Sequence, residues 1–187
     1  MITFQKIRWK NFLSTGDHWS EIDFLGHTTN LVVGTNGSGK STMLDALTFS
    51  LFNKPFRKIN KSQLINATNE KDCVVEVEFN VNNKDYLVRR SIKPNKFDIE
   101  VNGTLLHKES DDRFNQKLLE ESILKVNYKS FTQIVILGSS SFVPFMQLST
   151  SNRRDVIEDL LDIRIFSAMN TLIKEKIRTE KEKIRSL

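Results

Sequence analysis

Residues 34–41 read Gly-Thr-Asn-Gly-Ser-Gly-Lys-Ser and match the phosphate-loop pattern G-x-x-x-x-G-K-[ST]. A short apolar run, residues 30–33, precedes this stretch, and a helix-compatible stretch, residues 41–52, comes after it. A strand before the loop and a helix after it are the context that the pattern requires. The sequence therefore predicts a strand, a phosphate-binding loop and a helix in succession, which places the chain in the α/β class.

The residue types in the loop suit a nucleoside triphosphate. Its glycines let successive backbone N–H groups point at phosphate oxygens, and the following helix adds its positive end. We expect Lys40 to reach the β- and γ-phosphates as the catalytic cation, and Ser41 to bind Mg²⁺ through its hydroxyl. The other predicted ATP contacts are Asn36, Gly37, Ser38, Gly39 and Thr42. A glycine-rich turn that only joins a strand to a helix is disfavoured, because eight positions and both flanks agree with the motif.

The catalytic acids of a phosphate-loop ATPase are not evident in this sequence. Hydrolysis needs an acidic residue at the end of a second strand to hold Mg²⁺, and a group that orients the attacking water. No run of four apolar residues is followed by Asp or Glu, and the nearest match, residues 158–162, has a helical pattern. The chain alone is therefore predicted to bind ATP but to hydrolyse it poorly, with the catalytic complement supplied from elsewhere.

Antiparallel strands are predicted before and after the loop and its helix. Residues 2–9 and 19–24 read as a pair of strands joined through a turn. After the helix, strict alternation begins near Cys73, and the turn signals Asn82-Asn83 and Asn102-Gly103 divide the alternating region into strands. The predicted strands of this β-meander are residues 73–81, 85–92, 97–101 and 104–107.

The last part of the chain is predicted to be mainly helical. Ser110 can cap a helix, and residues 133–137 are a candidate buried strand. The apolar face of that capped helix is predicted to consist of Phe114, Leu118, Ile123 and Val126. Near the end, Ile173, Ile177, Ile184 and Leu187 recur at the spacing of an emerging heptad if the position of Glu180 is counted. We predict a lobe over residues 1–165 and the beginning of a coiled coil over residues 166–187.

Composition limits the class of protein. The 187 residues suffice for one ordinary domain, and 28 Lys and Arg against 23 Asp and Glu give a net charge of +5, which favours polyanionic partners. Cys73 is the single cysteine, so an internal disulfide is excluded and a reducing compartment is expected. The sequence shows neither a signal-peptide pattern nor a stretch of about 20 apolar residues for a membrane helix. A cytoplasmic protein is expected.

One basic segment is a candidate contact for the phosphate backbone of DNA. Lys54, Arg57, Lys58 and Lys61 lie in a stretch without acidic residues, between Ala46 and Asn69. Such contacts would be non-specific with respect to base sequence. A solvated loop explains the same residues, and this alternative stays open.

Several stretches resemble the SbcC-type SMC-like DNA-repair ATPases. They are residues 10–14 (KNFLS), residues 34–47, and residues 131–146 followed by 153–161. Residues 54–57, 63–66 and 133–138 resemble still more closely the large, exonuclease subunits of T-even phage recombination endonucleases. The resemblance implies an ABC-type ATPase head whose two halves are separated by a long antiparallel coiled coil, with this chain as the N-terminal half.

The same resemblance implies a function and a set of partners. Two heads of this family dimerise around ATP, and their engagement controls a nuclease that docks near the base of the coil during double-strand-break processing. The implied partners are the C-terminal half of the head, a second copy, the nuclease and double-stranded DNA, in the host-cell cytoplasm if the protein is phage-encoded. The C-terminal half would carry the second Mg²⁺ acid, the catalytic glutamate and the signature loop.

One position departs from the family pattern. Where SbcC-like proteins have a glutamine that contacts Mg²⁺ and positions water, this chain has Ser139. A hydroxyl is shorter than a carboxamide, so Ser139 could reach the metal only through water or a shifted loop.

Three alternatives remain. A chromosome-organising SMC head or a RecF-like repair protein would differ in coil length and nuclease partner. A small-molecule phosphotransferase could use the same loop, but it would need a lid with arginines and an acceptor pocket. An interaction module with a structural nucleotide would bind ATP without dimerising.

Overall fold

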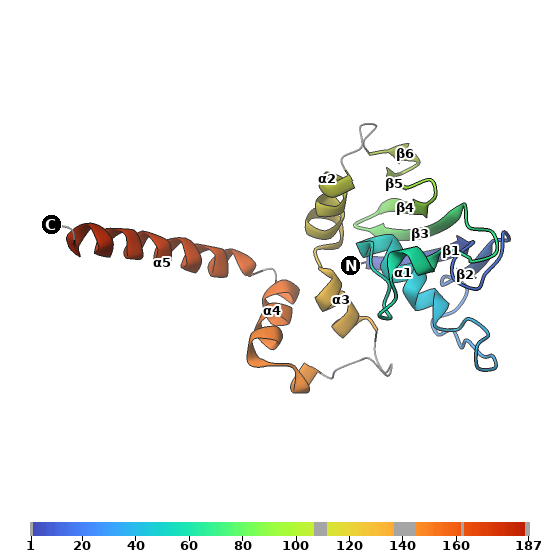
Figure 1. Ribbon diagram of the computed structural model, residues 1–187, viewed down its shortest axis with the longest axis horizontal. Helices are drawn as coiled ribbons and strands as arrows, with labels where there is room; N and C mark the ends of the chain where they lie inside the picture. Colours follow the sequence, from blue (N-terminus) through green and yellow to red (C-terminus); the bar gives the residue numbers. More distant parts are fainter. Residues whose placement is uncertain (1, 107–111, 137–144, 162, 186–187) are drawn as a thin grey trace. The chain divides into compact units, whose positions relative to one another are not determined.

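The computed structural model describes residues 2–106, 112–136, 145–161 and 163–185. The chain divides into two compact units, Met1–Leu124 and Lys125–Leu187. Unit 1 holds an antiparallel sheet and the phosphate loop, and unit 2 consists of helices and their connections (Figure 1). Three residues for which the sequence predicts a role, Ser110, Ser139 and Leu187, lie outside the described residues.

Unit 1 is built on a six-stranded sheet in the order β2-β1-β3-β4-β5-β6 (Figure 1). All neighbouring strands are antiparallel, and every pair except β1–β3 is consecutive in the sequence. The strands are β1 (Ile2–Lys10), β2 (Ser20–Asp23), β3 (Cys73–Val81), β4 (Lys84–Ile92), β5 (Lys96–Val101) and β6 (Thr104–Leu105). The predicted N-terminal strand pair and the predicted β-meander are therefore confirmed.

The turns of the meander have the backbone conformation that their sequences favour. Asn82 and Asn83 have φ angles of 50° and 62°, and Asn102 and Gly103 have φ angles of 49° and 77°. Positive φ at both central residues is typical of type I′ hairpin turns, whose twist matches that of the flanking strands. The Asn82-Asn83 turn sets the register that pairs β3 with β4, and the Asn102-Gly103 turn sets the register that pairs β5 with β6.

Helix α1 (Thr42–Phe52) packs against the sheet and closes the core of unit 1 (Figure 1). Phe49 and Leu51 are fully buried, and the Phe49 ring lies 5.8 Å from that of Phe12, centroid to centroid. Complete burial of such a side chain stabilises a fold by about 1.5–3 kcal/mol. The helix that begins at the phosphate loop is therefore fixed by the core.

A charged ladder crosses the sheet. Glu76 on β3 is 3% exposed and pairs with Arg8 of β1 and with Arg89 of β4, which are its register partners on the two neighbouring strands. Arg89 also lies 3.5 Å from the carboxylate of Glu100 on β5. Because Glu76 receives a guanidinium from each side, its buried charge is compensated.

The predicted strand at residues 30–33 is wrong for this structure. Residues 30–35 have no regular secondary structure, and Leu31 and Val33 are 87% and 81% exposed. An apolar strand of this kind forms in the interior of a parallel sheet, where neighbouring strands satisfy its backbone groups. The described strands belong to one antiparallel sheet, and none of them pairs with residues 30–33. This run therefore forms no strand although its residues favour one.

The predicted apolar face of the helix after residue 110 is partly wrong. Helix α2 (Asp112–Lys117) leaves Phe114 53% exposed, while Asn115 is buried. It continues into a π-helix, η2 (Leu118–Leu124), in which Leu119 and Ile123 are buried. The change to a wider helix shifts which positions face the core, so a face drawn with a constant 3.6-residue period misplaces part of it.

Unit 2 contains helices α3 (Tyr128–Ile134), α4 (Thr150–Leu160) and α5 (Arg164–Arg185), with a short 3₁₀ turn, η3 (Phe145–Gln147). The predicted strand at residues 133–137 is wrong where the structure describes it, because Gln133 and Ile134 end α3. A short apolar run fits a strand and a buried helix equally well. Here the Asn127 side chain accepts from the Ser130 N–H at 2.9 Å and caps the helix.

Helix α5 presents an apolar row to solvent. The exposed apolar residues of α5 are Ile165, Phe166, Met169, Leu172, Ile173, Ile177 and Ile184. The long C-terminal helix is thus confirmed, while its coiled-coil pairing stays a prediction. Among the described helices, none has the length and apolar character needed to cross a membrane.

Candidate nucleotide-binding site

The phosphate loop uses its glycines for two different reasons. Gly37 and Gly39 have φ angles of 87° and 93°, which side chains rarely tolerate. Gly34 has little space around it, since a Cβ there would lie 2.4 Å from the Ser38 hydroxyl oxygen. The backbone of the loop therefore depends on glycine at positions 37 and 39, whereas a side chain at position 34 would require the Ser38 side chain to shift.

The Lys40 side chain folds back over the loop. Its Nζ donates to the carbonyl oxygens of Gly34 at 2.7 Å and Thr35 at 2.8 Å. These contacts hold an ammonium group against the segment whose amides are predicted to bind phosphate. The structure thus brings together the cation and the curved backbone that a polyphosphate requires.

The first residues of α1 leave a hydroxyl for a metal ion. Ser41 is the N-cap of α1, but its side chain makes no capping hydrogen bond. Thr42 is buried and its N–H donates to Gly39 O at 2.9 Å, which joins the loop to the helix. No group of three or more His, Cys, Asp or Glu in the described part of the chain could hold a metal. The Ser41 hydroxyl thus fits a magnesium ion that keeps few protein ligands, and its role as a ligand stays a prediction.

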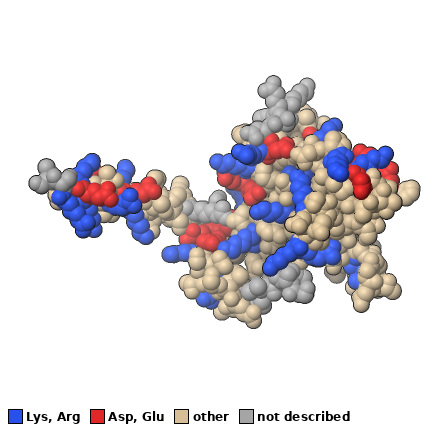
Figure 2. Space-filling view, viewed as in Figure 1, with Lys and Arg blue, Asp and Glu red and all other residues tan. Residues whose placement is uncertain are grey.

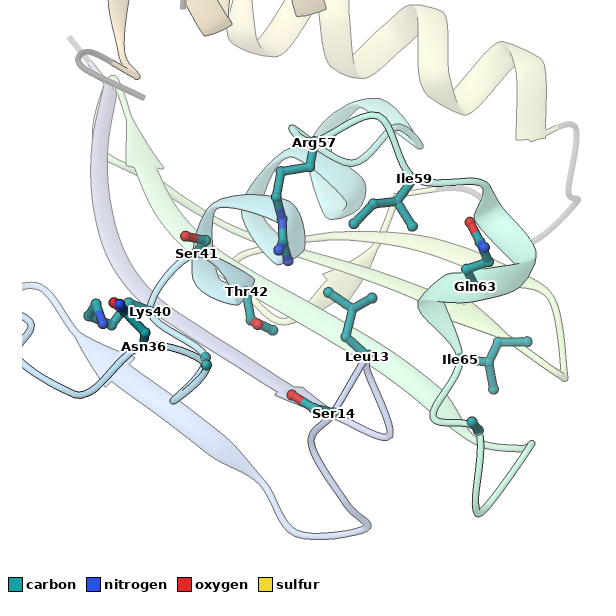
Figure 3. Close-up of a pocket in the computed structure, with 13 residues that line it drawn as sticks. Leu13, Ser14, Asn36, Lys40, Ser41, Thr42, Arg57, Ile59, Gln63 and Ile65 are labelled. Atoms are coloured by element: carbon teal, nitrogen blue, oxygen red, sulfur yellow. The ribbon is translucent and has the colours of Figure 1, made fainter. Parts of the chain in front are cut away.

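A pocket of about 600 Å³ extends from the loop (Figure 3). Its lining has two chemically distinct parts. The polar part, from the loop and α1, consists of Asn36, Gly37, Gly39, Lys40, Ser41 and Thr42. The second part comes from residues 13–14 and 57–67 and consists of Leu13, Ser14, Arg57, Ile59, Gln63, Ile65 and Ala67. This second part, called the apolar wall below after Leu13, Ile59, Ile65 and Ala67, also carries Ser14, Arg57 and Gln63. A glycine-rich polar end beside a partly apolar wall is the arrangement expected of a nucleotide site.

Five of the predicted ATP contacts, together with Lys40 itself, line this pocket. Asn36, Gly37, Gly39, Ser41 and Thr42 are all lining residues, whereas Ser38 lies in the loop and its N–H donates to Thr35 O at 3.2 Å. Their roles toward ATP and Mg²⁺ stay predictions.

Arg57 belongs to the pocket, although the sequence suggested a DNA contact. Its backbone N–H and its Nε donate to the two carboxylate oxygens of Asp45 at 2.8 Å and 2.6 Å. Asp45 lies on α1 and is fully buried. A buried acid is normally paired with a cation, and the Arg57 guanidinium, whose side chain is itself 44% exposed, is the partner of Asp45.

The other three basic residues of that segment differ in their surroundings. Lys58 is exposed, and Figure 2 shows Lys and Arg side chains over the part of unit 1 that contains α1 and the residues after it. Lys61 is also exposed, but its Nζ lies 3.3 Å from Asn95 Oδ1 and 5.9 Å from the Phe49 ring centroid. Partial burial, and then the nearby Arg90, lower the pKa of Lys61. DNA binding by Lys54, Arg57, Lys58 and Lys61 stays a prediction.

The wall residues were not predicted as contacts. Leu13 and Ser14 lie in the KNFLS stretch, and Gln63, Ile65 and Ala67 lie within or just after the QLIN stretch. The sequence draws attention to both stretches only through their resemblance to known ATPases. The isolated bridge between Phe12 and Ile65 brings them together. A contact between residues so far apart in the sequence produces no hydrophobic periodicity from which it could be predicted.

The chain matches a known protein family and several known proteins. The family model described as "AAA domain" matches residues 6–187. The chain is 43% identical over 172 residues to "Exonuclease subunit 2" of Enterobacteria phage T4, covering 92% of this chain and 30% of that protein. It is 27% identical over 190 residues to "DNA double-strand break repair Rad50 ATPase" of Sulfolobus acidocaldarius, covering 98% of this chain and 20% of that protein.

A solved structure supports the fold. The Smc head domain of Pyrococcus furiosus, with an extended coiled coil and bound to the C-terminal domain of ScpA, matches with a TM-score of 0.61 and 22% identity. The match covers 98% of this chain and 48% of that one. The resemblance seen in the sequence and the predicted head fold are therefore confirmed. The chain spans less than a third of the length of these two curated relatives.

Proposed function

This chain belongs to the AAA domain family, and from that premise we propose that it binds Mg-ATP as the N-terminal half of an SMC-like ATPase head in a DNA double-strand-break-processing exonuclease complex. The observation that carries the proposal is the pocket in which the phosphate loop, Lys40 and Ser41 meet an apolar wall. The names of the relatives, an exonuclease subunit and a DNA double-strand break repair ATPase, support the biological setting.

Different groups of the pocket would bind the phosphates and the metal ion. Backbone N–H groups of the loop and the positive end of α1 would bind the phosphate oxygens. Lys40 would exchange its contacts with Gly34 O and Thr35 O for the β- and γ-phosphates. Ser41 would hold Mg²⁺, which would supply positive charge to offset the negative charge that develops during hydrolysis.

Completion of the head by a C-terminal half is supported by the exposed apolar run before the loop. Leu31, Val32 and Val33 are 87%, 44% and 81% exposed, which is unfavourable for three consecutive apolar residues. A strand from the C-terminal half would pair with this run and bury it. The same half would bring the acid and the water-orienting groups that hydrolysis requires. Ser139 would contact the metal through water or through a shifted loop.

The exposed row on α5 supports the coiled coil. Its apolar side chains would be covered by a returning antiparallel helix. A nuclease subunit docked near the base of this coil, a second ATP-bound head and non-specific DNA complete the proposed assembly. In it, head engagement around ATP would control the nuclease.

The first test is ATP-dependent dimerisation. This chain is joined through a short linker to its native C-terminal half, and its mass is measured by light scattering with and without Mg-ATP. A dimer that requires ATP and is lost with Lys40→Ala is expected. A protein that binds ATP normally and stays monomeric would contradict the engaged-head mechanism, and it would favour a phosphotransferase or a module with a structural nucleotide. If dimers form, coil length and nuclease binding separate this function from that of an SMC or RecF-like head.

A further inference from the structure

Two segments that are far apart in the sequence lie side by side at the apolar wall of the pocket. The N–H of Leu13 donates to Leu64 O at 2.6 Å, and Phe12 forms an isolated antiparallel bridge with Ile65. The lining residues Leu13 and Ser14 belong to the first segment, and Gln63, Ile65 and Ala67 belong to the second. The shape of the wall therefore depends on how these segments are held together.

Asn66 joins the two segments with its side chain. Its Nδ2 donates to the carbonyl oxygens of Leu13 at 3.2 Å and Thr15 at 3.1 Å, across the junction. Its Oδ1 accepts from the N–H groups of Thr68 at 2.9 Å and Asn69 at 3.0 Å, within its own segment. Asn66 is 9% exposed and is not among the lining residues of the pocket. Both the Nδ2 and the Oδ1 of the carboxamide therefore form hydrogen bonds with backbone groups.

Asn11 fixes the same junction from the other side. Its carbonyl oxygen accepts from the N–H of Asn66 at 2.9 Å, and its Oδ1 accepts from Asn69 Nδ2 at 2.6 Å. Its Nδ2 donates to Asp17 Oδ1 at 3.1 Å and to Asp72 O at 3.3 Å. Asn11 is 1% exposed and has a φ angle of 50°. The junction is thus a buried, hydrogen-bonded polar cluster behind an apolar surface, which favours a single geometry.

The wall and the phosphate loop occupy different ends of the pocket. In Figure 3, Asn36 and Lys40 lie at one end and Ile59, Gln63 and Ile65 at the other. A nucleotide whose phosphates are bound by the loop would extend its ribose and base toward the wall. Apolar side chains that contact a base contribute to affinity only if they are held at the right position.

We propose that Asn66 is a positioning residue for the nucleoside moiety of the bound nucleotide. Its two donated bonds to the residue 13–15 segment hold Leu13 and Ile65 in one wall. The inference rests on the proposed function, because it assumes that a nucleotide binds with its phosphates at the loop. It assigns Asn66 an effect on nucleoside binding alone, since its side-chain hydrogen bonds join Leu13, Thr15, Thr68 and Asn69 and do not involve residues 34–42.

The test compares a ligand that has a nucleoside with one that consists of phosphates alone. Affinities for Mg-ATP and for inorganic tripolyphosphate with Mg²⁺ are measured by calorimetry on the 187-residue chain. Asn66→Asp and Asn66→Ser both retain an oxygen that accepts from Thr68 and Asn69, but both lack the Nδ2 donor that crosses the junction. Asn115→Asp is the matched control, because Asn115 is a buried asparagine on α2 outside the pocket.

Either Asn66 variant is expected to weaken ATP binding about tenfold, because the wall is no longer held in one position before the nucleotide binds, and to change tripolyphosphate binding less than about twofold. Asn115→Asp should change neither affinity. Equal losses for both ligands, or no loss for ATP in either variant, would overturn the proposal. If one variant does not fold, the other decides.

The affinities of the wild-type chain and of Lys40→Ala test the proposed function independently of the Asn66 variants. A wild-type chain that binds ATP and tripolyphosphate, and loses both with Lys40→Ala, upholds the nucleotide site whatever the Asn66 variants do. A wild-type chain that binds neither ligand would remove the proposed function, and the role of Asn66 with it.

Discussion

The β-meander and the apolar run before the phosphate loop differ in where their partners come from. Strands β3, β4 and β5 each find a partner a few residues away, through turns such as Asn82-Asn83. Residues 31–33 have similar β-propensity and remain exposed and unpaired by any described strand. A strand that pairs with its neighbour in the sequence needs only a short turn to form. A strand of a parallel sheet must pair with a strand that is remote in the sequence.

This difference extends to the nucleotide site. The loop is anchored on one side by α1, whose Phe49 and Leu51 are fully buried. On its other side it continues directly into the exposed run at residues 31–33. The C-terminal flank of the loop is therefore anchored in the core, and its N-terminal flank is not.

The largest expected effect is on hydrogen exchange at this run. In the present chain, the amides of residues 31–33 should exchange close to the unprotected rate, while those of Val75 and Val77 in β3 should be protected. Joining the native C-terminal half should protect residues 31–33 by about a thousandfold or more, since a paired core strand exchanges only through rare opening. Protection unchanged by the C-terminal half would show that the run is not a core strand, and the comparison with the meander would fail.

A second prediction compares stability in the two regions. Phe79 is fully buried on β3 and contacts the rings of Phe4 and Tyr86, with centroid distances of 5.9 Å and 5.4 Å. Phe79→Ala should lower the free energy of unfolding by about 3–5 kcal/mol. Val33→Ala removes an exposed side chain and should change it by less than about 0.5 kcal/mol. Urea unfolding measures both, and a large effect of Val33→Ala would mean that residues 31–33 are packed in solution.

Much of unit 1 could be predicted because its signals are local. Alternation from Val75 to Val81 and the asparagine turns locate the meander, and the loop motif locates the start of α1. Three features could not be predicted in this way. The turn of Arg57 toward Asp45, the junction at Asn66 and the π-helix after Lys117 all depend on contacts between distant residues or on a change of helical period.

A third prediction concerns the charged ladder that fixes the meander against β1. Glu76→Gln keeps the shape of the side chain but removes the charge that Arg8 and Arg89 share. Because both arginines are about one-third exposed, the cost should be nearer about 1–2 kcal/mol than the larger value for a fully buried pair. Glu21→Gln, which loses only an exposed pair with Lys6, is the control and should cost less than about 0.5 kcal/mol. Equal effects of the two variants in thermal unfolding would show that the ladder contributes nothing specific.

The smallest expected effect is the reactivity of Cys73, at the start of β3. The thiol is fully buried, and burial raises its pKa from 9.0 to about 12. Only the thiolate reacts with a disulfide reagent, so the native chain at pH 8 should show almost no reaction, whereas the chain unfolded in guanidinium should react completely. Above pH 9 the unfolded thiol loses its proton while the native one keeps it up to about pH 12, so this group lowers stability as the pH rises through that window. Rapid labelling at pH 8 under native conditions would show that β3 opens readily, and the contrast between a stable meander and an unpaired run at residues 31–33 would then be lost.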